Sequence, residues 1–451
     1  MMRKQLLFLL LLFMGISMQG YAERTLPTGE VYYRVHLGKW DVNVVCWKED
    51  ADYAELSLYQ SSWDDWDEFD IPEESMSSSF PNGERSFKLL YSIGEGAFWD
   101  CKKLTRVALP ACVRNIGSYA FKDCINLPGI DLPVGLKTIG DSVFIGCSKL
   151  TNIVIPARVM RIGCGAFGAC DNLVSLSVDN NNVYYSAVDG ILYSREKDTL
   201  VAYPGGKEAD YLFPESVTAI GGGAFFGCNK FSSLEIPSGI TCINDAAFYR
   251  CGELTSIRLP EGITEIPDRL MGECKKLVSV NVPNGVTKIG AYAFRECNSL
   301  KEIILPENLT TIRLGAFEGV VFQKVVMNNP VPPLLYNDVF SAAAYENATL
   351  YVPKGTMAAY QSAYIWKKFK NIEEMDLMDA PEIVAGEDAG ALEISCKDGM
   401  LTIQSKVAQS LIVYTLLGQV VATVSIAPGE NRISGLSEGV YIVNGQKVSI
   451  N

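Results

Sequence analysis

Residues 116–138 read IGSYAFKDCINLPGIDLPVGLKT, and residues 139–161 read IGDSVFIGCSKLTNIVIPARVMR. Both stretches follow the pattern I-G-x-x-A-F-x-x-C-x-x-L-x-x-I-x-L-P-x-x-V-x-x. Nine units keep this register from residue 93 onward, always 23 residues apart except for one spacing of 58 residues. A fixed period of this length is the signature of a repeat architecture. The units begin at Ile93, Ile116, Ile139, Ile162, Ile220, Ile243, Ile266, Ile289 and Ile312.

One unit of 23 residues is too short to bury its own apolar side chains, but stacked units can bury them together. Equivalent residues then lie about 4.8 Å apart, the spacing of hydrogen-bonded strands. Leu104, Val107 and Leu109 predict a short strand with alternate residues inward, which Pro110 ends because proline cannot donate to a strand ladder. We expect the glycine to permit a turn and the Ala-Phe pair to begin a short helical turn. The pattern therefore predicts a β-rich solenoid.

Two apolar positions of the unit form candidate ladders through the core. The first is the residue five places after each isoleucine, which is Met271 in one unit and elsewhere an aromatic residue. The second is a cysteine three places later, and buried free thiols are favoured there because all these side chains point the same way. Disulfides stay open, since strand spacing permits them; zinc is disfavoured because paired Cys spacings are absent. The ladders are Phe98, Phe121, Phe144, Phe167, Phe225, Phe248, Phe294 and Phe317, and Cys101, Cys124, Cys147, Cys170, Cys228, Cys251, Cys274 and Cys297.

The long spacing between Ile162 and Ile220 contains an insertion at residues 179–214. Asp189-Gly190 lies there between apolar stretches, and this dipeptide is typical of a β-hairpin turn. We expect a longer, atypical coil that remains in the stack.

The repeat resembles the BspA-like subclass of leucine-rich repeats, over about residues 93–327, and the insertion resembles that family's Y-x-x-x-D-G-x-L-Y…Y-P segment. The resemblance implies a leucine-rich repeat solenoid. It also implies a non-enzymatic protein on a cell surface, because the family includes adhesins that bind extracellular-matrix proteins or other bacteria.

The regions before the repeats suggest export and a cap. Residues 1–22 have a basic start, an apolar run and small residues at the end, which is typical of a signal peptide. Residues 23–92 are expected to form an N-terminal cap over the first open coil. Residues 49–74 contain eleven acidic residues and no basic one. A solvated acidic loop is favoured there over a calcium site, because the spacing fits no EF-hand.

Three segments follow the repeats: an expected C-terminal cap at 328–375, a linker at 376–391 and a strand-rich small β-sandwich at 392–451. The last segment resembles the C-terminal sorting domain of type IX secretion. The resemblance implies a role in delivery to the cell surface or the exterior. The matching residues are Tyr414, Gly418, Gly439, Tyr441 and Lys447.

Charge and composition argue against several functions. The chain carries 39 basic and 52 acidic residues, a net charge of −13, so it offers no electrostatic footprint for nucleic acid. His36 is the sole histidine, and no nucleophile or acid motif surrounds it. We therefore expect no catalytic residues, no metal site and no cofactor, and no later segment is apolar enough to span a membrane.

Binding is expected instead on the outward positions of the repeated strands, which are small and polar and suit an extracellular protein ligand. The alternative is a glycan-binding protein for nutrient capture, in which Trp63, Trp66 and the insertion aromatics between Tyr184 and Tyr193 stack on sugars. The candidate binding residues are Arg106, Asp131, Asn152, Ser177, Glu235, Arg258 and Asn281, with Arg106 and Arg258 as anchors.

Overall fold

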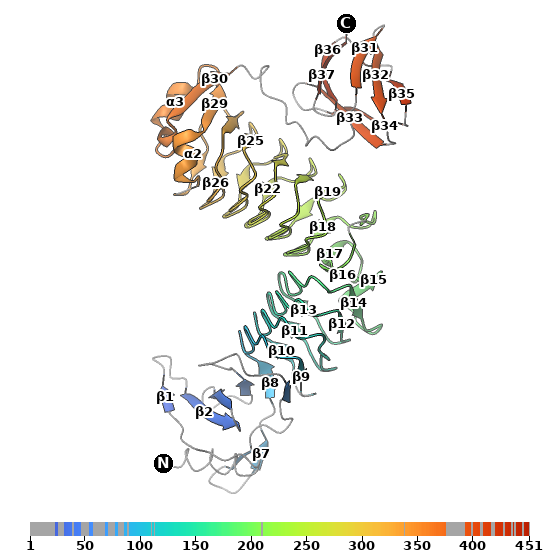
Figure 1. Ribbon diagram of the computed structural model, residues 1–451, viewed down its shortest axis with the longest axis vertical. Coiled ribbons are helices and arrows are strands. Elements are labelled where there is room, and N and C mark those ends of the chain that lie inside the picture. Colours follow the sequence, from blue (N-terminus) through green and yellow to red (C-terminus); the bar gives the residue numbers. More distant parts are fainter. Residues whose placement is uncertain are drawn as a thin grey trace. The chain divides into compact units, whose positions relative to one another are not determined.

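The computed structural model describes residues 90–375, except 110, 112, 209, 210 and 338, together with strands β1–β7 before this range and β31–β37 and residue 436 after it (Figure 1). The expected signal peptide and linker lie outside the described residues. The chain divides into two units: the first comprises Met1–Lys230 and Cys242–Cys251, and the second comprises Phe231–Thr241 and Gly252–Asn451. The leucine-rich repeats of each unit form a β-solenoid, and we call one repeat a coil.

The repeated isoleucines of the first unit form a parallel ladder, with Ile93, Ile116, Ile139 and Ile162 in register. Before the repeats, β1, β2, β3 and β4 pair antiparallel, and β4 pairs parallel with β8, so these strands extend the same sheet. The strands are β1 (Glu23–Thr25), β2 (Val31–Leu37), β3 (Trp40–Cys46), β4 (Ala54–Leu56), β8 (Leu90–Ile93), β10 (Asn115–Ile116), β11 (Thr138–Ile139) and β13 (Arg161–Ile162).

A second set of strands lies on the other side of each coil. In β9, Val107 is buried between exposed neighbours, and β12 alternates in the same way, as the sequence predicts. Two of these strands, β12 and β14, pair in parallel, as do β5 and β9; β6 and β7 form a separate antiparallel pair. The strands are β5 (Glu68–Asp70), β6 (Ser77–Ser79), β7 (Arg85–Phe87), β9 (Arg106–Ala108), β12 (Asn152–Ile155) and β14 (Ser175–Val178).

The stacked phenylalanine rings form the core, which we call the spine. In the first unit, the ring centroids of Phe98, Phe121, Phe144 and Phe167 are 5.0, 5.6 and 5.9 Å apart in succession, with nearly parallel planes. All eight predicted spine phenylalanines are buried. Stacking follows from the period, because each ring repeats directly above the last.

The segment that holds the ring differs from the expected helical turn. In the coil that begins at Ile116, the amides of Ala120 and Cys124 each donate to the carbonyl oxygen of the residue three positions earlier. Tyr119 and Asp123 have φ near 60°. Positive φ at the third residue is the mark of a type II turn. A helix is excluded because the amides of Tyr119, Phe121 and Asp123 donate to the next coil at 2.8–2.9 Å. We call this side of the coils the turn edge.

The glycine after the isoleucine also has a different role from the one expected. Gly117, Gly140 and Gly163 do not have positive φ. A Cβ atom on Gly140 would lie 2.5 Å from the amide nitrogen of Ser118 in the preceding coil. At Gly140 the missing Cβ therefore permits the close approach of two coils, whereas other coils have Asn244, Pro267 or Arg313 at this position.

The ladder cysteines are buried free thiols that bond from coil to coil. The Sγ atoms of Cys124, Cys147 and Cys170 donate to the carbonyl oxygens of Phe98, Phe121 and Phe144 at 3.0–3.1 Å. Burial raises the pKa of Cys170 to about 12, so these groups stay protonated. Each thiol thus provides a hydrogen bond to the carbonyl oxygen of the spine phenylalanine in the preceding coil.

The insertion forms the predicted hairpin, with φ values of 49° at Asp189 and 78° at Gly190. Its turn docks on β14, because the Leu176 amide donates to the Gly190 carbonyl at 2.7 Å. Tyr203 then takes a place in the spine, 5.3 Å from Phe225. The strands β15 (Tyr185–Val188), β16 (Ile191–Ser194), β17 (Thr199–Ala202), β18 (Ala219–Ile220) and β20 (Cys242–Ile243) form one sheet.

The second unit repeats both parallel ladders. Its strands are β19 (Ser233–Glu235), β21 (Ser256–Arg258) and β23 (Ser279–Val280); β22 (Glu265–Ile266), β24 (Lys288–Ile289), β26 (Thr311–Ile312) and β28 (Leu334–Leu335); and β25 (Glu302–Leu305), β27 (Lys324–Met327), β29 (Thr349–Pro353) and β30 (Asn371–Met375). The register continues past residue 327. Leu335 pairs with Ile312, and Phe340 stacks on Phe317 at 5.1 Å, so these residues begin a further coil that the sequence pattern missed.

Helices α2 (Ala342–Asn347), α3 (Met357–Ser362) and η1 (Trp366–Lys368) follow the last coil. The indole Nε1 of Trp366 donates to the Pro333 carbonyl at 2.8 Å, beside the edge strand β28. The Tyr360 hydroxyl donates to the Asn329 carbonyl at 2.6 Å. The Trp366 indole therefore satisfies a carbonyl group beside an edge strand, and the Tyr360 hydroxyl satisfies a second buried carbonyl group.

The C-terminal region consists of antiparallel strands. One sheet has the order β31-β32-β35 and the other β34-β33-β36-β37. Buried Leu401, Ile403, Ile433, Val443 and Val448 form its core. The strands are β31 (Glu393–Lys397), β32 (Met400–Ser405), β33 (Gln409–Thr415), β34 (Val420–Ile426), β35 (Gly429–Ile433), β36 (Gly439–Val443) and β37 (Gln446–Ile450).

Candidate functional site

The strand face of the first unit consists of the outward residues of β9, β12 and β14. Arg106, Asn152 and Ser177 are exposed there, and Asp131 is exposed in a coil that forms no strand at this position. Val154 is 59% exposed and is the Cα partner of Ser177. The hairpin turn at Gly190 lies against Ser175 and ends this ladder. The four predicted residues thus lie on one short, mostly polar surface.

The strand face of the second unit contains the other three predicted residues. Glu235 and Arg258 are exposed cross-strand partners on β19 and β21. Asn281 is half-buried, and its amide nitrogen donates to the Leu259 carbonyl at 2.9 Å while its Oδ1 accepts from the Leu259 amide at 2.7 Å. Its side chain therefore replaces a strand partner, and a ligand would have to compete with these bonds.

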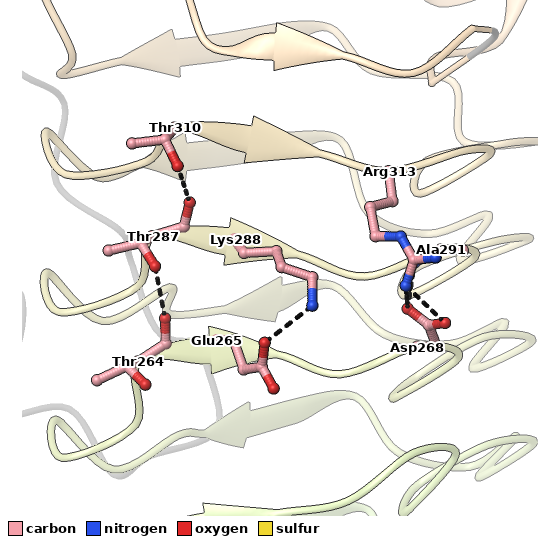
Figure 2. A network of polar contacts seen from close by, with 8 residues as sticks. All are labelled: Thr264, Glu265, Asp268, Thr287, Lys288, Ala291, Thr310 and Arg313. Carbon is pink, nitrogen blue, oxygen red and sulfur yellow. Dashed lines mark hydrogen bonds and ion pairs between the residues drawn. The ribbon is translucent and has the colours of Figure 1, made fainter.

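On the opposite strand ladder, polar side chains bond from one coil to the next (Figure 2). Lys288 contacts Glu265 at 3.0 Å. Both carboxylate oxygens of Asp268 accept from Arg313, at 2.9 and 3.0 Å. The Thr310 hydroxyl donates to the Thr287 carbonyl at 2.9 Å. Lys288 and Thr310 thus join neighbouring coils, whereas Arg313 reaches past one coil to Asp268, 45 residues earlier.

The insertion aromatics of the glycan alternative do not form a row. Tyr193 is 2% exposed, and its hydroxyl lies 3.1 Å from that of Tyr211. The Tyr185 hydroxyl accepts the Ile162 amide at 3.1 Å. Tyr184 is 47% exposed. Trp63 and Trp66 lie outside the described residues, so of the named groups that are described, Tyr184 alone offers an open ring.

The turn edge of the first unit carries a group that the sequence pattern did not single out. Trp99 and Tyr119 are 45% and 37% exposed, and their ring centroids are 6.2 Å apart. Lys122 Nζ lies 4.2 Å from the Trp99 centroid. The available signal was that two consecutive coils carry aromatic residues at turn positions. The position of Tyr119 is Gly96 and Ser142 in the adjacent coils, and the position of Trp99 is Lys122 in the next coil, although it is aromatic again at Phe226 and Tyr249.

Other features of the described residues bear on chemistry. A crevice beside Phe167, Tyr203 and Phe226 has a volume of about 10 Å³, room for about one water. Within residues 90–375 and the described strands, no three His, Cys, Asp or Glu side chains gather as a metal site requires. No helix in the described part of the chain is both long and apolar enough to cross a membrane.

Several solved structures are similar to the chain. A leucine-rich cell surface protein from Faecalibacterium prausnitzii is 22% identical, with a TM-score of 0.41, over 67% of this chain and 95% of that one. A leucine-rich repeat protein from Eubacterium ventriosum is 22% identical, with a TM-score of 0.43, over 62% and 87%. The pneumococcal vaccine antigen PcpA is 16% identical, with a TM-score of 0.46, over 79% and 97%. No curated protein matches the chain.

The family comparison rests on the repeats themselves. The family described as BspA type leucine-rich repeat region matches residues 85–188 and 209–342 in six copies. The two matched ranges hold the coils on either side of the insertion and make up just over half of the chain. The chain therefore belongs to the BspA-type leucine-rich repeat family.

Proposed function

We propose that this chain is a non-enzymatic, exported recognition protein that binds an extracellular protein through its strand faces. The observation that supports the proposal is that the side chains that fill the interior and join the coils differ from those on the strand faces. The spine and the thiol ladder fill the interior, and the ladder around Glu265 and Asp268 bonds coil to coil. Outward residues such as Asn152 and Arg258 remain exposed on a regular surface. Repeat proteins use surfaces of this kind for binding.

The anchors of this proposal are Arg106 and Arg258, because arginine is enriched among residues that dominate interface energies. The ligand class follows from the small, polar character of the strand faces and from the family resemblance to adhesins. Adhesion to matrix proteins or to other bacteria is part of the proposal.

The chain from residue 23 to 451 should be tested by surface plasmon resonance against a panel of purified extracellular-matrix proteins. We expect at least one to bind, and Arg258→Ala or Arg106→Ala to weaken binding about tenfold. Arg158→Ala is the control, because Arg158 is exposed but lies between β12 and β13, away from the strand face. Binding to no member of the panel, or binding that both anchor variants leave unchanged, would contradict the proposal.

We also propose that residues 392–451 act in delivery and take no part in ligand binding. The support is the resemblance to the type IX sorting domain together with the signal-peptide pattern. Deleting these residues should leave the repeats folded, measured by far-UV circular dichroism, and should abolish surface display in the native host. Unchanged display would contradict the delivery role.

A further inference from the structure

The exposed aromatic pair of the first unit has a geometry that suits a ligand. Trp99 and Tyr119 come from consecutive coils, and their ring planes are tilted by only 30°. We call these two exposed rings of consecutive coils the strip. Lys122 Nζ lies 4.2 Å from one centroid and 5.9 Å from the other, so one ammonium group serves both rings.

Packing within the coil does not require these rings. The residue equivalent to Trp99 two coils later, Ile145, is buried, whereas Trp99 is 45% exposed. Tyr119 adopts φ of 60°, a conformation that disfavours side chains with a Cβ. At the equivalent positions the coils before and two coils after have Gly96 and Gly165. Because Ser142, Ala246 and Arg269 have the same φ at this position, the turn of the repeat explains the backbone, and only the exposure of the two rings is left unexplained by packing.

The second unit offers a matched comparison. Tyr292 has the same place in its coil as Tyr119 and a φ of 58°. The guanidinium carbon of Arg295 lies 5.8 Å from the centroid of the Tyr292 ring. Here the group is closed: a Cβ on Gly315 would lie 2.6 Å from the Tyr292 ring, and Arg295 pairs with Glu318 at 3.3 Å. The equivalent of Trp99 is Gly272, so no second ring is present.

The chemistry of the strip selects among ligand classes. A cationic ligand would meet Lys122 on the Trp99 ring and be repelled. A polyanion would meet a chain of net charge −13 and carboxylates at Asp100 and Asp123. A neutral sugar avoids both penalties, because its C–H faces pack on aromatic rings and its hydroxyls bond to charged groups.

We propose that Trp99, Tyr119 and Lys122 form a binding site for a neutral, linear glycan, separate from the strand faces. Trp99 and Tyr119 stack against adjacent pyranose rings. Lys122, whose side chain is 24% exposed, turns away from the Trp99 face and donates to a sugar hydroxyl, which replaces the lost cation–π contact. Asp100, paired with Lys102 at 3.1 Å, and Asp123, 3.8 Å from Lys122, supply acceptors beside the strip.

Isothermal titration calorimetry of the chain from residue 23 to 451 tests this site, with cellohexaose, mannohexaose, maltohexaose and hexagalacturonate as probes. We expect at least one neutral hexasaccharide to bind, and Trp99→Ala to weaken it at least about tenfold. Tyr119→Ala should weaken it less. Lys122→Met, which keeps an unbranched apolar stem but removes the ammonium group, should weaken it severalfold. Tyr292→Ala is the matched control and should have no effect.

Two sets of outcomes overturn the site. One is that no neutral probe binds, or that hexagalacturonate alone binds. The other is that Trp99→Ala changes the glycan affinity by less than about twofold, or by no more than the control Tyr292→Ala does. Thermal unfolding of each variant checks that the fold is intact, and Trp99→Phe should retain part of the affinity. Loss of glycan binding leaves the Arg258 test of the strand face unaffected, so the two proposals fail separately.

Discussion

Replacing Phe121 by alanine should open the first unit locally and measurably. Its ring is fully buried and is stacked 5.0 Å from Phe98 and 5.6 Å from Phe144. Truncating a buried phenylalanine costs about 3–5 kcal/mol, and each lost aromatic pair accounts for about 0.5–1.5 kcal/mol of this. Two lost pairs place Phe121→Ala in the upper part of that range.

The thiol ladder supplies the assay for this loss. Cys124 and Cys147 are buried, and burial raises their pKa well above the ordinary value, so a thiol reagent reacts only when the coil opens. At 1.4 kcal/mol per factor of ten, the upper part of that range raises their labelling rates by roughly three to three and a half orders of magnitude. Mass spectrometry at each cysteine measures these rates.

The control and the distant probe make the test decisive. Phe121→Leu keeps an apolar core residue and should have a much smaller effect. Cys297 in the second unit should change little, because repeat coils contact mainly their neighbours. A rise of less than about threefold at both Cys124 and Cys147 would falsify the spine as the main source of stability. An equal rise at Cys297 would show that stability is shared along the chain.

Three further outcomes follow from single contacts. Gly140→Ala should lower the free energy of unfolding in urea by about 1–3 kcal/mol, because its Cβ would meet the backbone of the preceding coil. A Cβ at Gly129 meets nothing within 4 Å, so the control Gly129→Ala should change this free energy by less than about 0.5 kcal/mol. Burial raises the pKa of Cys297 from 9.0 to about 12. The folded state therefore keeps a proton that the unfolded state loses, so stability should fall between pH 9 and pH 12, and Cys297→Val should make the fall shallower by one proton. Asn182→Ala should cost about 2–4 kcal/mol by chemical denaturation, because the buried amide makes four bonds, to Pro156, Val159, Tyr184 and Tyr185; a cost equal to that of an exposed asparagine would contradict this role.

The period of the sequence was enough to predict the solenoid and its interior. Because every position repeats above itself, Ile116 must pair with Ile139 and Phe121 must stack on Phe144, and both are observed. The hairpin at Asp189 was also predictable, because that turn is encoded by two adjacent residues. Local pattern and register carry this information without knowledge of any distant contact.

The features that sequence reasoning missed depend on contacts between coils. The role of Gly140 appears only when the backbone of Ser118 is placed 2.5 Å from the missing Cβ. The turn at Phe121 is no helix, because its amide is needed by the next coil. Phe340 continues the spine although the motif around it has faded.

The same limit applies to the candidate sites. The sequence placed Asn281 on an outward strand position, but the structure shows that its side-chain amide is bonded to the backbone of Leu259. The structure also places Trp99 beside Tyr119, and these two residues belong to consecutive coils. A repeat determines which residues point outward, because direction follows from the strand and the register. Only the tertiary structure decides which outward groups are already bonded and which lie together, because those contacts depend on the particular side chains that neighbouring coils present.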